Sequence, residues 1–177
     1  AIVPPFNYCE IEDILDLAKE RNEDPFVLIL DGIEDPHNLG SIIRTAETAG
    51  VHGIIIPKRR SASLNATVAK SASGALEYMK VARVTNIPTT IDELKERGVW
   101  VYGLDMDGET WCRTDLTGAV ALVVGSEGEG VSRVVKDACD GIVSIPMYGK
   151  VNSFNVSTAA AILLAEAARQ HAAAREN

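Results

Sequence analysis

The sequence predicts an α/β domain in which helices flank a parallel sheet. Short apolar runs of strand length alternate along the chain with longer segments of helical periodicity, an alternation typical of β–α units. Several of the apolar runs are continuous, which is the pattern of strands that helices bury on both faces. With 177 residues, 46% of them hydrophobic, the chain has the size and composition of one domain with a substantial core.

The first half of the chain is expected to alternate between strands and helices. The segments are a strand at FVLIL (26–30), a helix carrying NLGSIIRTAETAG (38–50), a strand at VHGIII (51–56), a helix beginning in LNATVAKSA (64–72) and a strand at MKVARV (79–84). The first of these helices has one apolar stripe at helical spacing, so it is expected to pack on the sheet. The stripe consists of Leu39, Ile42, Ile43, Ala46, Ala49 and Gly50.

The second half continues the alternation. Its segments are a helix at TTIDELKERG (89–98), strands at VWVYGL (99–104) and AVALVVG (119–125) with the polar loop DMDGETWCRTDLTG between them, a short helix in EGVSRVVKDAC, a strand at GIVSIP (141–146) and a final helix from Asn155 to about Ala174. For the helix at 89–98, Thr89 or Thr90 is the expected cap and Gly98 the expected stop.

The final helix, FNVSTAAAILLAEAA, is apolar or small almost all round. Such a helix is expected to be buried on more than one side, and the sheet covers only one of them. A second copy of the chain is the simplest cover for the other side. The sequence therefore predicts a homodimer formed through the C-terminal helix.

Cysteine usage and charge limit the class of protein. Cys9, Cys112 and Cys139 are far apart and form no C-x-x-C pair, which argues against a disulfide framework or a zinc site and for a reducing cytosol. No stretch has the pattern of a signal peptide or of a membrane span, so we expect a cytoplasmic protein. The net charge is −8, but residues 57–84 hold six basic residues and one acidic one, a local patch that suits a polyanion.

The glycine-rich stretch VVGSEGEGVS (123–132) follows the most apolar strand. Its glycine order does not match the G-x-G-x-x-G dinucleotide fingerprint, and it has neither the lysine of a P-loop nor the G-x-S-x-G of a hydrolase. A tight turn without a ligand is one interpretation. The other is a site for a cationic ligand without phosphate, such as S-adenosylmethionine, because Glu127 and Glu129 would repel phosphate. Glu129 is expected to be no more than an exposed acid at the start of a helix.

Three stretches together carry a resemblance to a known family. In order and spacing, NLGSIIRTAETAG (38–50), VVGSEGEGVS (123–132) and IPMYGKVNSFNVSTAAAILLAE (145–166) resemble the three motifs of the SpoU/TrmH RNA ribose 2′-O-methyltransferases, within the SPOUT superfamily. SGALEYMKVARVTN (73–86) is similar to the family's middle segment, and the likeness extends from about Phe26 to Arg169. The resemblance implies a deep C-terminal trefoil knot, which no propensity argument predicts. It also implies S-adenosylmethionine bound between the second and third motifs, and a dimer with its sites near the interface.

The resemblance also implies roles for individual residues. Catalytic positions match Arg44, Asn38, Glu127, Ser153 and Asn155, with Asn152 a further polar position of the third motif. Cofactor contacts match Gly125, Ile145, Phe154, Met147, Gly149 and Ser153. The family usually has leucine where this chain has Phe154, so we expect altered packing against the cofactor with binding retained. No metal is required, and no metal-ligand cluster is present in the sequence.

Plainer interpretations of the same residues stay open. Asn38 is also suited to capping the helix that it begins, and Arg44 to a surface pair with Glu47. Ser153 and Asn155 are suited to capping the last helix. If Arg44 does act in catalysis, it is either the base, aided by a substrate phosphate, or the group that orients the phosphate while another group takes the proton.

The basic residues and the domain organisation bear on the identity of the RNA substrate. Lys58, Arg59 and Arg60, with Lys70 and Arg83, are the expected RNA-facing patch. We expect residues 1–22 to be a linker remnant and an N-terminal helix, and 23–177 to be a SPOUT methyltransferase catalytic domain whose N-terminal RNA-binding domain is absent from this chain. This organisation favours a guanosine of 23S ribosomal RNA. Transfer RNA, or a non-catalytic RNA-binding role for the same fold, is the alternative.

Overall fold

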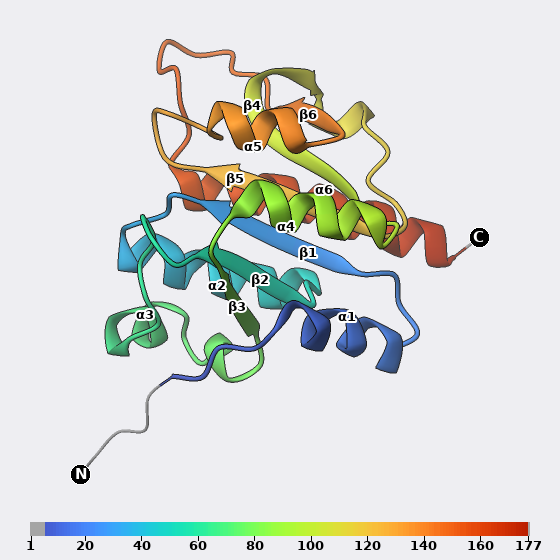
Figure 1. Ribbon diagram of the computed structural model, residues 1–177. Helices are drawn as coiled ribbons and strands as arrows, with labels where there is room; N and C mark the ends of the chain where they lie inside the picture. The colour runs from blue at the N-terminus through green and yellow to red at the C-terminus, as the bar shows by residue number, and fades with distance from the viewer. Residues whose placement is uncertain (1–5, 177) are drawn as a thin grey trace.

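The computed structural model describes residues 6–176, which form a parallel six-stranded sheet covered by helices on both faces (Figure 1). The N-terminal linker expected from Pro4 and Pro5 lies outside the described residues, whereas the expected N-terminal helix is present. The elements are α1 (Ile11–Glu20), β1 (Phe26–Asp31), α2 (Pro36–Ala49), β2 (Gly53–Pro57), α3 (Ala66–Ser71), the 3₁₀ turn η1 (Ala75–Glu77), β3 (Lys80–Val84), α4 (Ile87–Glu96), β4 (Trp100–Thr110), η2 (Trp111–Arg113), β5 (Val120–Gly125), α5 (Arg133–Ala138), β6 (Gly141–Ser144) and α6 (Val156–Arg175).

The strand order in the sheet is β3-β2-β1-β5-β4-β6, and every neighbouring pair is parallel. This confirms the predicted parallel sheet. β1 and β5 occupy the centre and pair along their whole length, from Phe26 with Val120 to Asp31 with Gly125. The two strands therefore end side by side, so that the chain leaves both at the same edge of the sheet.

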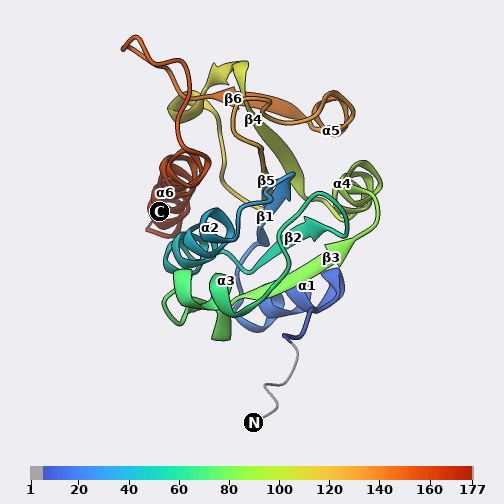
Figure 2. The same cartoon turned by 90° about the vertical axis from the view of Figure 1, so that its left-hand side faces the viewer.

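Each face of the sheet has its own group of helices (Figure 2). One core cluster joins alternate residues of β1, such as Leu28 and Leu30, to α2, α3 and α6. The other joins the intervening residues Val27 and Ile29 to α1, α4 and α5. Because both faces of β1 are buried, its sequence is continuously apolar, as expected for a central parallel strand.

The start of α4 corrects a prediction. Asn86 is the N-cap, and its side-chain oxygen accepts a hydrogen bond from the Thr89 backbone N–H at 2.9 Å. Thr89 and Thr90 therefore lie inside the helix, and the expectation that one of them caps it was wrong. An asparagine directly before a proline-containing first turn satisfies the exposed N–H groups one turn earlier. Gly98 follows the helix end with φ +82°, as a stop residue does.

The strand β4 is longer than expected. It pairs with Val143 of β6 twice, first through Leu104 and again through Glu109, so that residues 105–108 loop out of the ladder. A Cβ on Gly108 would lie 2.4 Å from a carbonyl oxygen of β6, so this glycine allows the two backbones to meet again. The expectation of a polar loop directly after residue 104 was wrong for the residues up to Thr110, which belong to β4. Hydropathy does not reveal a strand that resumes after a bulge.

The last helix, α6, is covered on one side within the chain. Ala160, Leu163, Leu164 and Ala167 are fully buried in the core cluster shared with α2. The homodimer expected to cover the opposite side stays a prediction, as does the threading of the C-terminal segment into a knot. Within residues 6–176, none of the helices is both long and apolar enough to cross a lipid bilayer.

The buried His52 gives the fold a predicted pH dependence. His52 Nδ1 accepts a hydrogen bond from the Phe26 N–H at 2.9 Å, so the ring hydrogen is on Nε2, which faces Glu23 at 3.2 Å. Burial lowers the pKa of His52, although the hydrogen bond to Glu23 opposes this shift. The unfolded chain therefore binds the proton more readily, with a pKa of about 6.5. We expect the contribution of His52 to the free energy of unfolding to be constant above pH ~6.5. It should decrease as the pH falls below this value.

Urea unfolding between pH 5 and 7.5 checks this expectation. His52→Asn is the matched variant, because its side-chain oxygen can still accept the Phe26 N–H without titrating. We expect the variant to lose stability less steeply with falling pH than the unmodified protein. Equal slopes for the two proteins would show that His52 does not govern this dependence.

Candidate functional site

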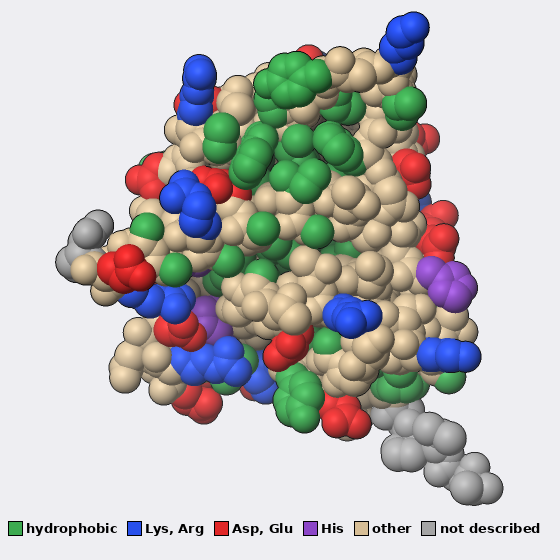
Figure 3. All heavy atoms as spheres, turned by 180° about the vertical axis from the view of Figure 1, so that it is seen from behind, with side chains coloured by type: hydrophobic (Ala, Val, Ile, Leu, Met, Phe, Trp, Pro, Cys, Tyr) green, Lys and Arg blue, Asp and Glu red, His purple; other side chains and the backbone are tan. Residues whose placement is uncertain are grey.

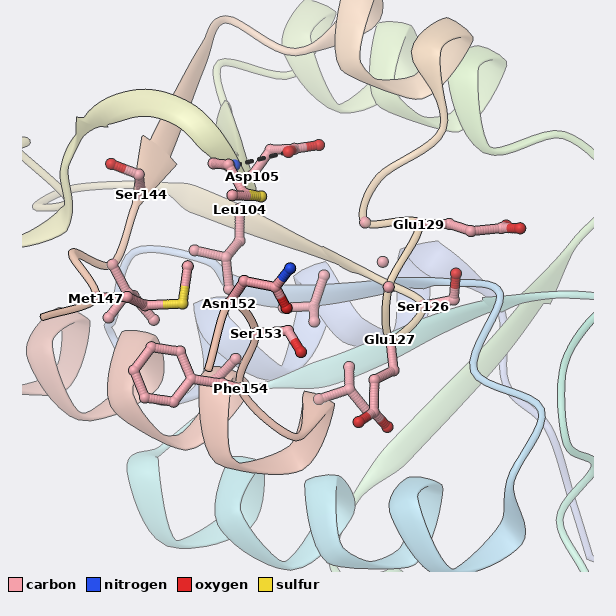
Figure 4. A pocket seen from close by; sticks show the side chains of 18 of the residues that line it. Leu104, Asp105, Ser126, Glu127, Glu129, Ser144, Met147, Asn152, Ser153 and Phe154 are labelled. Carbon is pink, nitrogen blue, oxygen red and sulfur yellow. Dashed lines mark hydrogen bonds between the residues drawn. The ribbon is translucent and has the colours of Figure 1, made fainter. Parts of the chain in front are cut away.

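A cleft of about 580 Å³ opens at the carboxyl ends of β5 and β6, beside the middle of β4 (Figure 4). Its walls are residues 104–106 within β4, the segments that follow β5 and β6, and the first turn of α6. Ligands of open parallel sheets bind at this edge, where loops leave the strands. The strand order places β4 between β5 and β6, so the glycine-rich loop after β5 and the segment after β6 lie on opposite sides of the part that β4 contributes.

The glycine-rich loop folds back on the strand that it leaves. The Gly130 N–H donates to the Ser126 carbonyl at 2.8 Å, and Gly128 and Gly130 have φ of +85° and +68°. A Cβ on Gly125 would lie only 2.0 Å from the Gly130 carbonyl oxygen, so no larger residue fits there without moving the loop. The loop therefore presents backbone to the cleft, as the sequence predicted. Ser132 N–H, which donates to the Asp31 carboxylate at 2.9 Å, ties the end of the loop to β1.

The segment between β6 and α6 forms the opposite wall. Ile145, Met147, Asn152, Ser153 and Phe154, all of them predicted site residues, line the cleft. Figure 4 shows the Phe154 ring lying next to the Met147 side chain, so the two form one apolar corner. The predicted contact Gly149 does not line the cleft and is exposed near the tip of the segment.

Two predicted polar residues from distant parts of the chain meet beside this wall. The Asn155 side-chain amide donates to the Asn38 side-chain oxygen at 3.4 Å, across 117 positions of sequence. Asn155 also caps α6, accepting from the Ser157 N–H at 3.0 Å, so the capping interpretation is confirmed for Asn155 and was wrong for Ser153, which precedes the cap. Asn38 does not cap α2, because the helix begins at Pro36 with Asp35 as N-cap. Its side chain is therefore available for other contacts.

Arg44 lies two turns further along α2 and is exposed. No ion pair joins it to Glu47 in the described part of the chain, so the plain surface pair is not formed. Its Nη1 instead donates to the Ser73 hydroxyl at 3.4 Å. Arg44, Asn38 and Asn155 lie outside the cleft lining, whereas Glu127 and Ser153 belong to it. Figure 4 shows the Glu127 side chain extending from its loop toward α2, the helix that carries Asn38 and Arg44.

The charge of the cleft is negative. Asp105, Glu127 and Glu129 line it, and none of its lining residues is lysine, arginine or histidine. Asp105 is paired with Lys136 at 3.3 Å, whereas no ion pair is formed by Glu127 or Glu129 with any residue in 6–176. Such a cleft repels phosphate and favours a cationic ligand.

Glu129 differs from its expected role. It lines the cleft, and α5 begins only at Arg133 with Ser132 as N-cap, so Glu129 is not a helix-start acid. Leu104, Asp105 and Met106 of β4 are site residues that the sequence did not indicate. The available signal in the sequence was Asp105, an acidic residue directly after the apolar strand at 99–104. The residues from 105 onward were instead expected to form a polar loop.

Cys139, the C-cap of α5, is not among the residues that line the cleft. Burial raises the pKa of the Cys139 thiol to about 12, which keeps it protonated at neutral pH. Over the described range 6–176, no group of three or more His, Cys, Asp or Glu side chains is arranged to hold a metal ion.

The predicted basic patch lies around the edge strand β3. Lys58, Arg59, Arg60, Lys70 and Arg83 are exposed, and the Arg83 guanidinium lies 3.9 Å from the centroid of the Tyr8 ring. A separate apolar surface gathers on the upper part of the face in Figure 3, over the region of β4, β6 and the start of α6. Exposed side chains of this region include Met106, Tyr148 and Val151, with exposed fractions of 66%, 96% and 76%.

Comparisons with known proteins match this geometry. Residues 25–165 match the profile of the SpoU rRNA Methylase family. The putative TrmH family tRNA/rRNA methyltransferase YacO of Bacillus subtilis (strain 168) is 52% identical over 171 residues, which are 96% of this chain and 69% of that protein.

Solved structures share the fold. The SpoU methyltransferase AviRb of Streptomyces viridochromogenes, crystallised with the cofactor AdoMet, aligns with a TM-score of 0.77 and 32% identity, over 83% of this chain and 60% of that chain. An RNA 2′-O ribose methyltransferase aligns with a TM-score of 0.75 and 28% identity, over 83% of this chain and 57% of that chain. The chain thus spans less than two thirds of these solved proteins.

Proposed function

Because this chain belongs to the SpoU rRNA methylase family, we propose that it transfers a methyl group from S-adenosylmethionine to a ribose 2′-hydroxyl of RNA. The observation that carries the proposal is the joining of the three family segments at one edge of the sheet. The loop after β5 and the segment before α6 form the cleft, and the contact between Asn155 and Asn38 brings α2 beside it. A 2′-O ribose methyltransferase among the structural relatives supports the hydroxyl as the methyl acceptor.

The cleft suits S-adenosylmethionine in size and charge. Its volume of about 580 Å³ lies within the range of roughly 300–1,000 Å³ for small-molecule sites. The acids of the cleft favour the sulfonium and the amino group, and the corner of Met147 and Phe154 offers apolar surface to an adenine. Gly125, Gly128 and Gly130 of the glycine-rich loop line the cleft without side chains, so a ligand can approach the backbone closely there. AviRb, crystallised with the same cofactor, supports this assignment.

The chemistry divides between the cofactor and the chain. S-adenosylmethionine supplies an activated methyl group on a sulfonium that leaves as a neutral thioether. The chain must hold the 2′-oxygen in line with that methyl group and remove the hydroxyl proton. Asn38 and Asn155, already in contact, are proposed to hold the ribose, while Glu127 extends from the cleft toward α2. Positioning is thus the main task of these three residues.

Arg44 is the proposed catalytic residue on the substrate side. Its guanidinium is exposed on α2, the helix that also carries Asn38, and no carboxylate in residues 6–176 neutralises it. An arginine is normally fully protonated, so it acts as a base only with assistance. In this version of the mechanism a substrate phosphate assists Arg44 in accepting the hydroxyl proton. In the second version of the mechanism, Arg44 holds the phosphate and another group takes the proton.

The favoured substrate is a guanosine of 23S ribosomal RNA, with transfer RNA as the alternative. The basic patch around β3 is the proposed RNA-facing surface, because exposed lysine and arginine side chains bind phosphate. The apolar surface in Figure 3, over the region of β4, β6 and the start of α6, is proposed to belong to the dimer contact together with the rest of α6. A deep C-terminal knot belongs to the same proposal, as in the family that the sequence resembles.

Methyl transfer from tritiated S-adenosylmethionine to 23S ribosomal RNA and to transfer RNA tests the function. A 2′-O-methyl group blocks alkaline cleavage at its own nucleotide, so we expect the label in an alkali-resistant dinucleotide. Label released in mononucleotides would overturn the 2′-O assignment. Label in transfer RNA alone would establish the alternative substrate, and RNA binding without transfer would indicate the non-catalytic role.

Glu127 provides a further prediction. Its side chain is exposed and forms no ion pair in the described residues, so the fold does not depend on it. We expect Glu127→Gln to lower the methyl-transfer rate by about ten-fold or more, as for loss of a charged hydrogen-bonding group, with an unchanged melting temperature. Glu96→Gln, at the exposed end of α4, is the control and should alter neither quantity. An unfolded Glu127 variant by circular dichroism would contradict a role confined to the site.

A further inference from the structure

The turn that joins α3 to η1 holds a serine in an unfavourable backbone conformation. Ser73 has φ +52°, in the left-handed region that non-glycine residues rarely adopt, and Gly74 follows with φ +88°. The turn is anchored on both sides, because Ala72 is fully buried and Ala75 is 7% exposed. The packed flanks therefore hold Ser73 at one place on the surface, at an energetic cost that a glycine would avoid.

This turn packs directly against α2. His37, Gly40 and Arg44 follow one another at spacings of three and four, so they share one face of that helix. At Gly40 the contact is so close that a Cβ would lie 2.4 Å from the Ser71 Cβ. On one side of this contact His37 Nδ1 lies 3.1 Å from the Ser71 hydroxyl, and on the other Arg44 Nη1 donates to the Ser73 hydroxyl at 3.4 Å. The glycine contact thus sets the distance between Arg44 and the turn.

Ser73 is the polar group that restrains Arg44. Among residues 6–176, its hydroxyl is the only acceptor of a hydrogen bond from the guanidinium. An exposed arginine otherwise samples many rotamers, and ordering it costs entropy at the moment of reaction. The distance of 3.4 Å is long, as catalytic hydrogen bonds often are before the substrate binds.

We infer that Ser73 is a positioning residue that aims Arg44 at the RNA substrate, an inference that rests on the proposed function. Its oxygen accepts one N–H of the guanidinium and leaves the remaining donors for the substrate. Glycine would form this turn more easily, but it has no hydroxyl. The energetic cost of the left-handed backbone at Ser73 is thus the cost of placing a hydroxyl at the turn.

Ser73→Gly separates the two roles, because it removes the hydroxyl and relieves the backbone together. We expect a melting temperature equal to or above that of the unmodified protein, an unchanged dissociation constant for S-adenosylmethionine by calorimetry, and a kcat lower by about ten-fold, the size expected for a hydrogen bond to a charged group. Asn22→Gly is the matched control, since Asn22 has φ +54° and no contact with Arg44. It should change stability in the same direction and leave kcat unaltered.

Coupling between the residues completes the test. In an Arg44→Lys background, Ser73→Gly should cause no further loss, because the shorter cation does not use the hydroxyl. A wild-type kcat for Ser73→Gly, an equal loss in both backgrounds, or a loss of kcat that follows a lowered melting temperature would each overturn the inference. Failure of the proposed function is a different result, namely no methyl transfer to RNA by the unmodified protein.

Discussion

Replacing Arg44 by alanine is expected to lower methyl transfer to RNA by about 100-fold or more, the range that a catalytic acid–base or charge-stabilising group contributes. The physical reason is the position of the guanidinium, which is exposed on α2, the helix that also carries Asn38, and lies outside the cofactor cleft. S-adenosylmethionine binding should therefore remain nearly intact. Single-turnover transfer and calorimetric titration of the cofactor measure the two quantities separately.

The control for this variant is Arg21→Ala, which removes an exposed arginine that follows α1 on the opposite face of the sheet. It should leave both transfer and cofactor binding unaltered. If Arg44→Ala instead abolished cofactor binding, its role would be structural. Arg44→Lys distinguishes the two catalytic versions: a lysine can still attract a phosphate but cannot reproduce the planar, two-pronged contact.

Gly125→Ala is expected to weaken S-adenosylmethionine binding by at least about ten-fold, equivalent to ~1.4 kcal/mol. The added Cβ would lie 2.0 Å from the Gly130 carbonyl oxygen and 2.4 Å from the Val131 backbone nitrogen. Both atoms belong to the backbone, so the loop must move away from β5. Since the loop forms one wall of the cleft, its movement changes the cofactor site directly. Calorimetry and thermal unfolding measure the effects on binding and on the fold.

Gly118→Ala provides the comparison. Gly118 lies in the connection before β5, its φ is +73°, and a Cβ there would meet no atom within 4 Å. This change should cost a little stability, about 1–2 kcal/mol for an alanine in the left-handed region, without affecting cofactor binding. Equal losses of affinity in the two variants would show that the close approach at Gly125 is not what shapes the cleft.

Much of the fold is local in origin and could be predicted. The continuous apolar runs correspond to buried parallel strands, and Leu39, Ile42, Ile43 and Ala46 of the α2 stripe pack in the core with Ala49 partly buried against it. Gly50 was wrongly included in the stripe, because it is the exposed C-cap of the helix. The cap of α4 was misplaced because an asparagine, a proline and two threonines compete within a few residues, and in the structure the Asn86 side chain caps the helix. The excursion at residues 105–108 was missed because its cause is a glycine that allows contact with another strand.

The same division applies to the site. Gly125, Glu127, Ser153 and Phe154 could be predicted, because a glycine loop after a strand and a set of spaced motifs are properties of short segments. Asp105 was not, since its place in the cleft depends on β4 lying between β5 and β6 in the sheet. Which strands become neighbours in a sheet depends on the packing of the whole chain, and no local sequence pattern indicates it.

The sequence by itself determined the parallel α/β class, the positions of the strands and the acidic glycine loop, since hydropathy period and backbone freedom act over a few residues. Only the tertiary structure decided which residues meet: Asn155 with Asn38 across 117 positions, and Arg44 with Ser73 across 29. Such contacts exist because α2 packs against both α3 and α6 on one face of the sheet. That packing is a property of the complete core, in which each helix is placed by the others.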